Sequence, residues 1–245
     1  MLFGVLWYGL GLLRQRWSWL RFLHNDLIIG MVIWLVTYII WMGIPLTTGW
    51  FADGPRPPNF TFSPDSDAMT YDLVAQNLLA GEGFRFRKWR IAVRRPMLGS
   101  ILALMHSIAG LGYEDILDLQ VAFLALIPVL VYAFTRKLHT QFSGILAALL
   151  IMMRERNAIL LGDRITVAHA KFLMSDLPAM LGVLLFLWLF LHWAQKPKGR
   201  GVFALMTGGV IGIFMLVRQE LVVLVPFLLL IALASMLRKP LRWLQ

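Results

Sequence analysis

The chain has 245 residues, of which 59% are hydrophobic and 15% are charged, and its formal net charge is +10. Soluble domains carry about 25% charged residues and about 45–50% apolar ones, so a soluble enzyme, a fibre and a disordered chain are excluded. The chain has no cysteine, which excludes disulfides, thiolate metal sites and cysteine nucleophiles. The sequence has no basic stripe with interleaved aromatic residues, so it does not favour nucleic acid as a partner. In a membrane protein, the positions of basic residues first indicate which side of the membrane each loop lies on.

Residues 1–26 are expected to lie at the membrane interface. The first thirteen residues are apolar but too short to cross about 30 Å of hydrocarbon. Tryptophans and arginines follow them, as is typical of interfacial segments. No basic region precedes the apolar run, so a cleaved signal peptide is not expected.

Residues 27–51 contain no charge and are long enough to form the first transmembrane helix. Prolines inside the later apolar stretches are tolerated where neighbouring groups satisfy the backbone. These later stretches are Leu119–Thr135, Leu138–Met153, Leu177–Gln195, Gly201–Val217 and Leu221–Leu237. The sequence therefore predicts an all-α, polytopic transmembrane helix bundle of about six spans, with residues 117–245 forming most of it.

Residues 97–113 are uncharged and could either cross the membrane or lie in its outer interface. If they lie flat, the short cytoplasmic loops carry about twice as many Lys and Arg as the short outer loops; if they cross, the two sides are equal. The positive-inside rule favours the flat arrangement. The N-terminus is then cytoplasmic, residues 52–116 form a long extracytoplasmic loop with in-plane helices, and the chain is a multi-pass protein of the cytoplasmic (inner) membrane.

A helix is expected within this loop, beginning near Ser63 and ending before Gly81. Ser63 can cap the helix, and Pro64 suits its first position. Gly81 and Gly83 are typical of a helix end.

The aspartates of this helix are predicted to differ in environment. At about 100° per residue, Asp67 lies in the middle of an apolar stripe with Tyr71, whereas Asp65 and Asp72 lie on the opposite, solvated face. One interpretation of Asp67 is a favourable charge in the first turn, worth about 0.3–1 kcal/mol. The other is a functional carboxylate, because a charge placed against membrane or protein is costly and is usually kept for a partner or a task.

A basic patch follows the helix, with six cations in eleven residues. One interpretation is a solvated loop. The other is an anion site at the outer headgroup level, where aromatic side chains contact acyl chains and guanidinium groups bind a lipid phosphate. The six are Arg85, Arg87, Lys88, Arg90, Arg94 and Arg95.

The run from Pro64 to Phe84, followed by Arg95-Pro96-Met97, resembles the first outer loop of C-type (GT-C) glycosyltransferases. The similar group comprises protein O-mannosyltransferases and aminoarabinose transferases. The family pattern begins with an Asp four residues before a Tyr, which Asp67 and Tyr71 match. It continues with Gly-x-Gly-Phe and with a Pro-rich return, the segment that leads from the loop back to the membrane. Family members usually carry Pro-Pro at that return and are longer, so the chain is expected to correspond to their N-terminal module.

Two later stretches are also similar to this family. Ser175-Asp176-Leu177-Pro178 resembles the acid at the outer start of a later helix, and Arg218-Gln219-Glu220 resembles an Arg-x-Glu at an outer turn. The alternatives are a helix cap at Asp176 and a charged turn at Arg218.

The resemblance implies transfer of a sugar from a polyprenyl-phosphate donor to an unidentified acceptor hydroxyl on the outer face, with inversion. Asp67 would be the general base. The departing phosphate would be stabilised by Arg94 and Arg95, with Arg90 and Arg218 as further candidates. Supporting residues would be Asp65, Tyr71 and Asp176.

The sequence favours neither a metal nor another cofactor, because the five histidines are scattered and no pair has ligand spacing. The alternative to an enzyme is a membrane protein that binds lipid phosphates without chemistry, either as a carrier or as a non-catalytic subunit. Ionisable residues at mid-membrane would indicate a transport pathway, whereas here the polar residues gather on one side of the bilayer.

Overall fold

The computed structural model describes residues 25–58, 60–86, 89–90, 95–195 and 201–237. The helices, in chain order, are Asn25–Met42, α2 (Ser66–Leu79), α3 (Pro96–Ala109), α4 (Tyr113–Leu124), α5 (Leu126–Leu138), α6 (Gln141–Leu160), α7 (Asp176–Gln195), α8 (Gly201–Met215), the 3-10 helix η2 (Gln219–Val223) and α9 (Leu224–Leu237). Strand β1 (Ala52–Asp53) pairs antiparallel with β2 (Ser63–Pro64), and β3 (Arg85–Phe86) pairs antiparallel with β4 (Trp89–Arg90). The predicted all-α class is confirmed.

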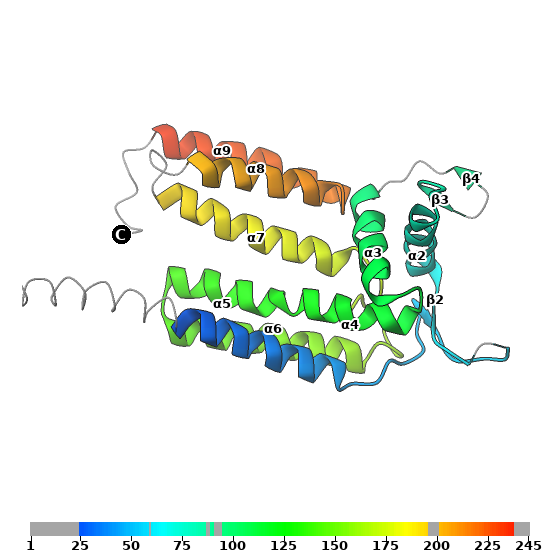
Figure 1. Ribbon diagram of the computed structural model, residues 1–245. Helices are drawn as coiled ribbons and strands as arrows, with labels where there is room; N and C mark the ends of the chain where they lie inside the picture. The colour runs from blue at the N-terminus through cyan, green and yellow to red at the C-terminus, as the bar shows by residue number, and fades with distance from the viewer. Residues whose placement is uncertain (1–24, 59, 87–88, 91–94, 196–200, 238–245) are drawn as a thin grey trace, which may run out of the picture.

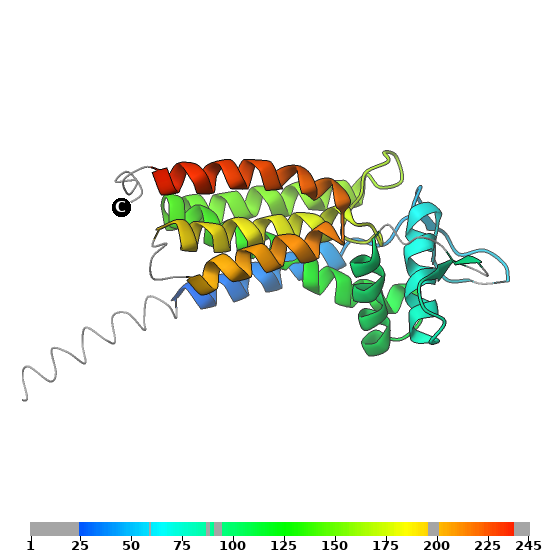
Figure 2. The same cartoon turned by 90° about the horizontal axis from the view of Figure 1, so that it is seen from above.

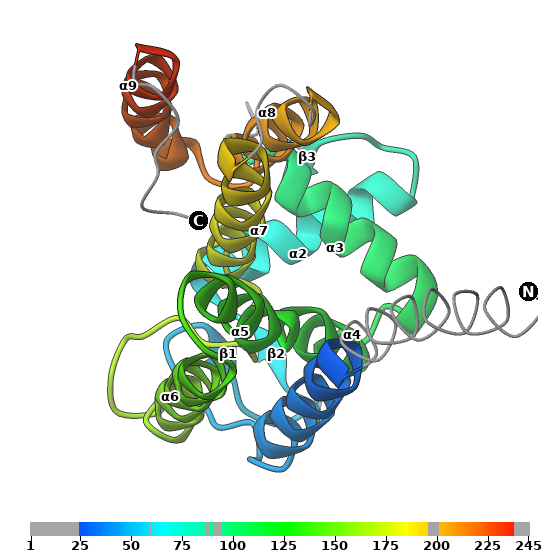
Figure 3. The ribbon, with the colours of Figure 1, turned by 90° about the vertical axis from the view of Figure 1, so that its left-hand side faces the viewer.

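The long helices run side by side as a bundle, and α2 and α3 lie across one end of it (Figure 1). Figure 3 looks along the bundle and shows α5, α6, α7, α8 and α9 nearly end on. Three of the described helices are long and apolar enough to cross a membrane: Asn25–Met42, Tyr113–Leu138 (α4 with α5) and Asp176–Gln195. Shorter apolar helices cover Pro96–Ala109, Gly201–Met215 and Gln219–Leu230.

The first apolar helix is shorter than the sequence predicts. A span over 27–51 was expected from the absence of charge, whereas the helix covers Asn25–Met42. Gly43 and Pro45 follow the helix, and both residue types favour a helix end. The uncharged residues after them belong to the connection that leads to strand β1.

The second half of the loop between α6 and α7, residues 169–175, is buried and is held by hydrogen bonds to the end of the first helix and to α4. Lys171 is 4% exposed, and its Nζ lies 3.2 Å from Met42 O and also donates to Ile44 O. Gln120 Nε2, from α4, donates to Ala170 O at 2.7 Å. A cation at the C-terminal end of the first helix also complements the helix dipole. This loop is therefore fixed to two membrane helices.

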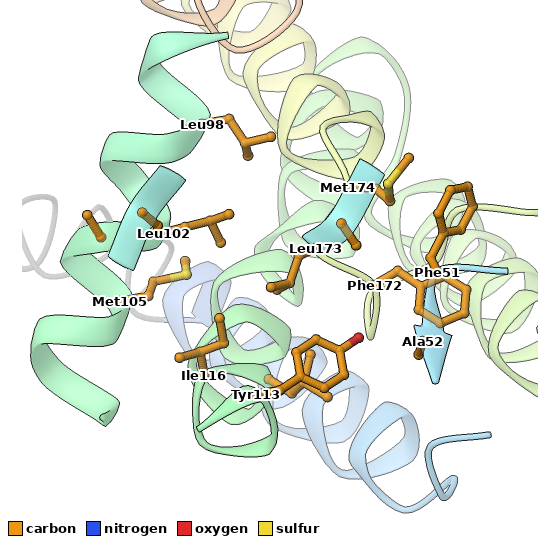
Figure 4. Close-up of a cluster of buried hydrophobic side chains, with 14 of the residues drawn as sticks. Phe51, Ala52, Leu98, Leu102, Met105, Tyr113, Ile116, Phe172, Leu173 and Met174 are labelled. Carbon is orange, nitrogen blue, oxygen red and sulfur yellow. The ribbon is translucent and has the colours of Figure 1, made fainter. Parts of the chain in front are cut away.

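Helix α3 packs against the buried part of this loop. Figure 4 shows Leu98, Leu102 and Met105 of α3 facing Phe172 and Leu173 of the loop. Tyr113 and Ile116 of α4 complete the same buried cluster. The layer at the end of the bundle therefore shares one hydrophobic core with the membrane helices.

α2 packs on α3 and lies further from the bundle (Figure 2). The two helices approach closely at Gly99, where an added Cβ would lie 3.0 Å from Val74 Cγ1. α3 crosses the end of the bundle (Figure 1); that it lies in the plane of the membrane stays a prediction.

The start of α2 differs from the prediction, whereas its end agrees with it. Ser63–Pro64 form strand β2 and neither caps nor begins the helix. Asp65 is the cap, because its Oδ1 accepts a hydrogen bond from Ser66 N at 2.7 Å. Gly81 and Gly83 follow the helix with φ angles of 76° and 75°, a conformation that glycine adopts without strain. An Asp in the cap position satisfies the backbone as well as a Ser would.

Candidate functional site

The burial of Asp67 and Asp72 on α2 is the reverse of the prediction. Asp72 is 5% exposed, and Asp67 is exposed. The buried face of the helix also contains Ala68, Val74 and Ala75, which pack towards α3 and the bundle. The prediction that Asp72 is solvated and that Asp67 lies at the centre of the buried face is therefore wrong.

Asp72 can be buried because partners satisfy both of its oxygens. Its Oδ1 lies 2.7 Å from His106 Nε2 of α3, and its Oδ2 accepts a hydrogen bond from Gln76 Nε2 at 2.8 Å. Buried carboxylates are tolerated when they are paired and hydrogen-bonded. Counting apolar positions along α2 alone does not reveal a partner that is 34 residues away in sequence.

Tyr71 and Arg95 join α2 to the start of α3. Arg95 Nη1 donates a hydrogen bond to Tyr71 OH, and the guanidinium carbon lies 5.6 Å from the centre of the tyrosine ring. Burial raises the pKa of Tyr71; the charge of Arg95 opposes this rise, and the charge of Asp67 adds to it. Asp67 precedes Tyr71 by one helical turn, so its carboxylate lies on the same side of α2 as this contact.

A second guanidinium lies near the first, held by residues from the C-terminal half of the chain. Arg218, immediately before η2, donates from Nη1 to Asp176 Oδ1 at the start of α7. Arg218 Nε lies 3.5 Å from Glu220 Oε2. Arg95 Nη2 lies 3.7 Å from the other oxygen of Glu220, Oε1. Glu220 therefore bridges the two guanidinium groups.

The backbone also fixes the position of Arg95. Met97 N, two residues further on, donates to Leu216 O at 3.3 Å, just after the end of α8. Pro96 occupies the first position of α3, where its missing N–H costs no hydrogen bond. The first turn of α3 is therefore attached to the end of α8, close to Arg218 in the chain.

The structure gathers five of the predicted site residues in one partly exposed cluster. Glu220 belongs to the cluster too; the resemblance of Arg218-Gln219-Glu220 to an Arg-x-Glu turn included it, but no role was predicted for it. The side chain of Arg90, which lies in β4, and the whole of Arg94 lie outside the described residues. The five residues are Asp67, Tyr71, Arg95, Asp176 and Arg218.

Chemically, the cluster offers two guanidinium groups and the hydroxyl of Tyr71, with the exposed carboxylate of Asp67 on the same side of α2 as Tyr71. A guanidinium has five N–H donors in a planar fork, so each arginine can bind an anionic oxygen while it keeps the contacts described above. Among the described residues, no group of three or more His, Asp or Glu side chains is arranged to hold a metal ion.

The chain was compared with family models, curated proteins and solved structures. The model of the family described as dolichyl-phosphate-mannose-protein mannosyltransferase matches residues 93–245. This range includes Arg95, Asp176 and Arg218, and it begins after Asp67 and Tyr71. No curated protein and no solved structure matches the chain.

Proposed function

Because the chain belongs to the dolichyl-phosphate-mannose-protein mannosyltransferase family, a family of membrane glycosyltransferases of the GT-C type, we propose that it transfers a sugar from a polyprenyl-phosphate donor to an acceptor hydroxyl. The reaction would take place at the end of the bundle that carries α2 and α3. The observation that carries this proposal is the contact between Arg95 and Tyr71, which places a guanidinium group on the side of α2 that bears Asp67.

In this proposal, Asp67 is the general base. Its exposed carboxylate can be reached by an acceptor from the aqueous side. It would take the proton of the acceptor hydroxyl while the oxygen attacks the anomeric carbon of the sugar, a contribution of about 10²–10⁴-fold. The bond from the anomeric carbon to the phosphate oxygen breaks, and its electron pair leaves with the phosphate. A single displacement from the opposite face inverts the anomeric centre.

Arg95 and Arg218 would stabilise the departing phosphate. Guanidinium forks bind phosphate oxygens with two parallel hydrogen bonds, and charge that develops on a leaving group is best met by donors already in position. Tyr71 would hold the guanidinium of Arg95. Asp176 and Glu220 would orient Arg218; of the two supporting roles predicted for Asp176, orienting the acceptor or an arginine, the contact with Arg218 supports the second. Arg90 and Arg94 remain further candidates for the phosphate.

The position of the cluster suits a lipid-linked donor. α3 exposes Leu104 (62%) and Ile108 (69%) at the end of the apolar bundle. Exposed apolar side chains at this level would contact acyl chains, and arginines beside them would lie at the depth of headgroup phosphates. A polyprenyl phosphate presents its reactive phosphate at the same depth. The orientation of this end towards the outside of the inner membrane remains a prediction.

The test is transfer by the purified full-length chain in liposomes supplied with labelled polyprenyl-phosphate sugars and a panel of acceptor hydroxyls. Turnover is expected, and Asp67→Asn should lower it by about 100-fold or more while donor binding is kept. Asp163→Asn is the matched control, because Asp163 is also an exposed carboxylate and lies in the loop after α6. Full activity of Asp67→Asn would reject the catalytic role. Saturable donor binding without turnover in the unmodified chain would instead favour the carrier or subunit.

A further inference from the structure

Glu220 places one carboxylate oxygen near each of two arginines. Its Oε1 lies 3.7 Å from Arg95 Nη2, and its Oε2 lies 3.5 Å from Arg218 Nε. Both distances are longer than the roughly 2.7–2.9 Å of a charge-assisted hydrogen bond. The side chain of Glu220 is 61% exposed, and ion pairs exposed to this extent are weak. The contacts of Glu220 are therefore easily broken.

Arg95 and Arg218 each have a second partner to which they are directly hydrogen-bonded. Arg95 Nη1 donates to Tyr71 OH, and Arg218 Nη1 donates to Asp176 Oδ1. The two arginine side chains are only 22% and 30% exposed, so the surrounding protein also restricts them. Both guanidinium groups therefore keep their positions if the carboxylate of Glu220 moves away.

A carboxylate resembles part of a phosphate group. Each is an anion that presents two oxygens to a guanidinium fork, and arginine binds both in the same planar geometry. A single oxygen at the outer edge of one fork would leave Glu220 undisturbed. A phosphate that contacts both guanidinium groups at once needs the space between them, which the carboxylate of Glu220 occupies.

Charge also prevents Glu220 and a phosphate from sharing this space. A hydrogen bond from its own backbone, followed by the charges of Arg218 and Arg95, lowers the pKa of Glu220, so its side chain is ionised at neutral pH. Two anions between the same two cations repel each other. Because the side chain is exposed, rotation about its own bonds carries the carboxylate into water.

From these contacts we propose that the carboxylate of Glu220 holds the place that the donor phosphate takes, and that it leaves this place when the donor binds. Glu220 orients Arg218 until then, and Asp176 continues to do so afterwards. A ligand whose phosphate reaches both arginines displaces the carboxylate, whereas an uncharged lipid does not. For the identity of the phosphate ligand, this inference rests on the proposed function.

The experiment measures equilibrium binding of labelled farnesyl phosphate, an isoprenyl phosphate without a sugar, to the purified full-length protein in uncharged detergent. Glu220→Gln keeps the shape of the side chain and removes its charge. This variant should lower the Kd for farnesyl phosphate about two- to fivefold, the factor that one exposed ion pair contributes. Binding of farnesol, which has no phosphate, should not change. If Glu220 only orients the arginines, the same variant should bind farnesyl phosphate more weakly.

Two further variants complete the test. Glu82→Gln is the matched control, because Glu82 is also exposed but lies beyond the C-terminal end of α2; it should leave the Kd unchanged. In a chain that carries Arg95→Ala, the gain from Glu220→Gln should shrink, since one of the two cations that attract both anions is gone. The proposal is overturned if Glu220→Gln binds farnesyl phosphate no more tightly, if Glu82→Gln gains equally, if the gain persists with Arg95→Ala, or if no variant binds this ligand.

This binding test does not depend on turnover. Tighter binding of farnesyl phosphate by Glu220→Gln in a chain that transfers no sugar would reject the proposed function and keep the place assigned to the phosphate. Sugar transfer by the unmodified chain, together with an unchanged Kd in Glu220→Gln, would keep the proposed function and reject the role of Glu220.

Discussion

His106 Nε2 lies 2.7 Å from Asp72 Oδ1, and both side chains are buried between α3 and α2. The other ring nitrogen, Nδ1, lies 2.8 Å from Gly110 O, so both nitrogens face acceptors. A ring that donates from both nitrogens is an imidazolium, which makes the contact an ion pair. Burial lowers the pKa of His106, but the hydrogen bonds to Asp72 and Gly110 and the charge of Asp72 outweigh it, so the pKa is raised.

Replacing one partner of this pair is expected to be strongly destabilising. His106→Ala leaves the carboxylate of Asp72 buried without its counter-charge, and breaking a buried pair in this way costs about 3–5 kcal/mol. The free energy of unfolding, measured by chemical denaturation in detergent, should fall by that amount. The double variant Asp72→Leu/His106→Leu removes both charges and should cost less than the single variant. A double variant that is less stable than His106→Ala would contradict this account.

The same pair predicts how stability depends on pH. The folded-state pKa of His106 lies above its ordinary value of 6.5, so the protonated ring is favoured by folding. The contribution of the pair is therefore fully present below about pH 6.5 and is lost as the pH rises through the folded pKa. The melting temperature of the unmodified chain should exceed that of His106→Gln most at low pH, and the difference should narrow towards alkaline pH. A difference that stays constant with pH would show that the pKa of His106 is the same in the folded and the unfolded state.

The contribution of Arg95 to the rate of sugar transfer is expected to depend on the planar guanidinium group and not only on its positive charge. Arg95→Ala should lower kcat by about 10²–10³-fold, the usual effect of removing one donor that stabilises charge in the transition state. Arg95→Lys keeps the charge but lacks the planar fork, so it should recover only part of the activity. Tyr71→Phe removes only the hydroxyl that accepts from Arg95 and should cost less than Arg95→Ala. Single-turnover rates with labelled donor measure all three; wild-type rates for Arg95→Ala would exclude it from the site.

Lys171 is expected to stabilise the junction between the first membrane helix and the loop beneath α3. Lys171→Met keeps the length of the side chain but leaves the carbonyl groups of Met42 and Ile44 without their donor. Unsatisfied buried polar groups cost about 1–3 kcal/mol, and the loss should appear in thermal denaturation. Arg164→Met is the control, because Arg164 is 78% exposed in its side chain and such changes usually stay within about 0.5 kcal/mol. Equal stability of the two variants would show that the contacts of Lys171 contribute nothing.

The sequence could predict the properties that depend on neighbours along the chain. Long apolar runs indicated membrane helices, and the glycines at 81 and 83 indicated the end of α2. The four-residue spacing of Asp67 and Tyr71 placed both on one side of that helix. Arg95, Asp176 and Arg218 entered the predicted site through resemblance and were then found close together.

What the sequence could not predict depends on contacts between distant segments. Asp72 looked solvated because nothing in α2 itself shows that His106 supplies a counter-charge from α3. Nothing near Lys171 in the sequence distinguishes it from a solvated lysine in a loop, whereas its side chain is buried and its ammonium group donates to the carbonyl oxygens of Met42 and Ile44. Asp65 rather than Ser63 caps α2 because β1 pairs with residues 63–64, a long-range pairing that local capping rules do not include.

The hydrogen bond from Met97 N to Leu216 O links the layer of α2 and α3 directly to the end of the apolar helix α8. α8 is an apolar helix of 15 residues, shorter than the roughly 20 that span a bilayer, and a short apolar helix is accommodated by local thinning of the bilayer. The force that this mismatch exerts on the end of α8 acts on Leu216 and, through Met97, on the backbone that carries Arg95. Sugar transfer by the reconstituted chain should therefore vary with the acyl-chain length of the host vesicles.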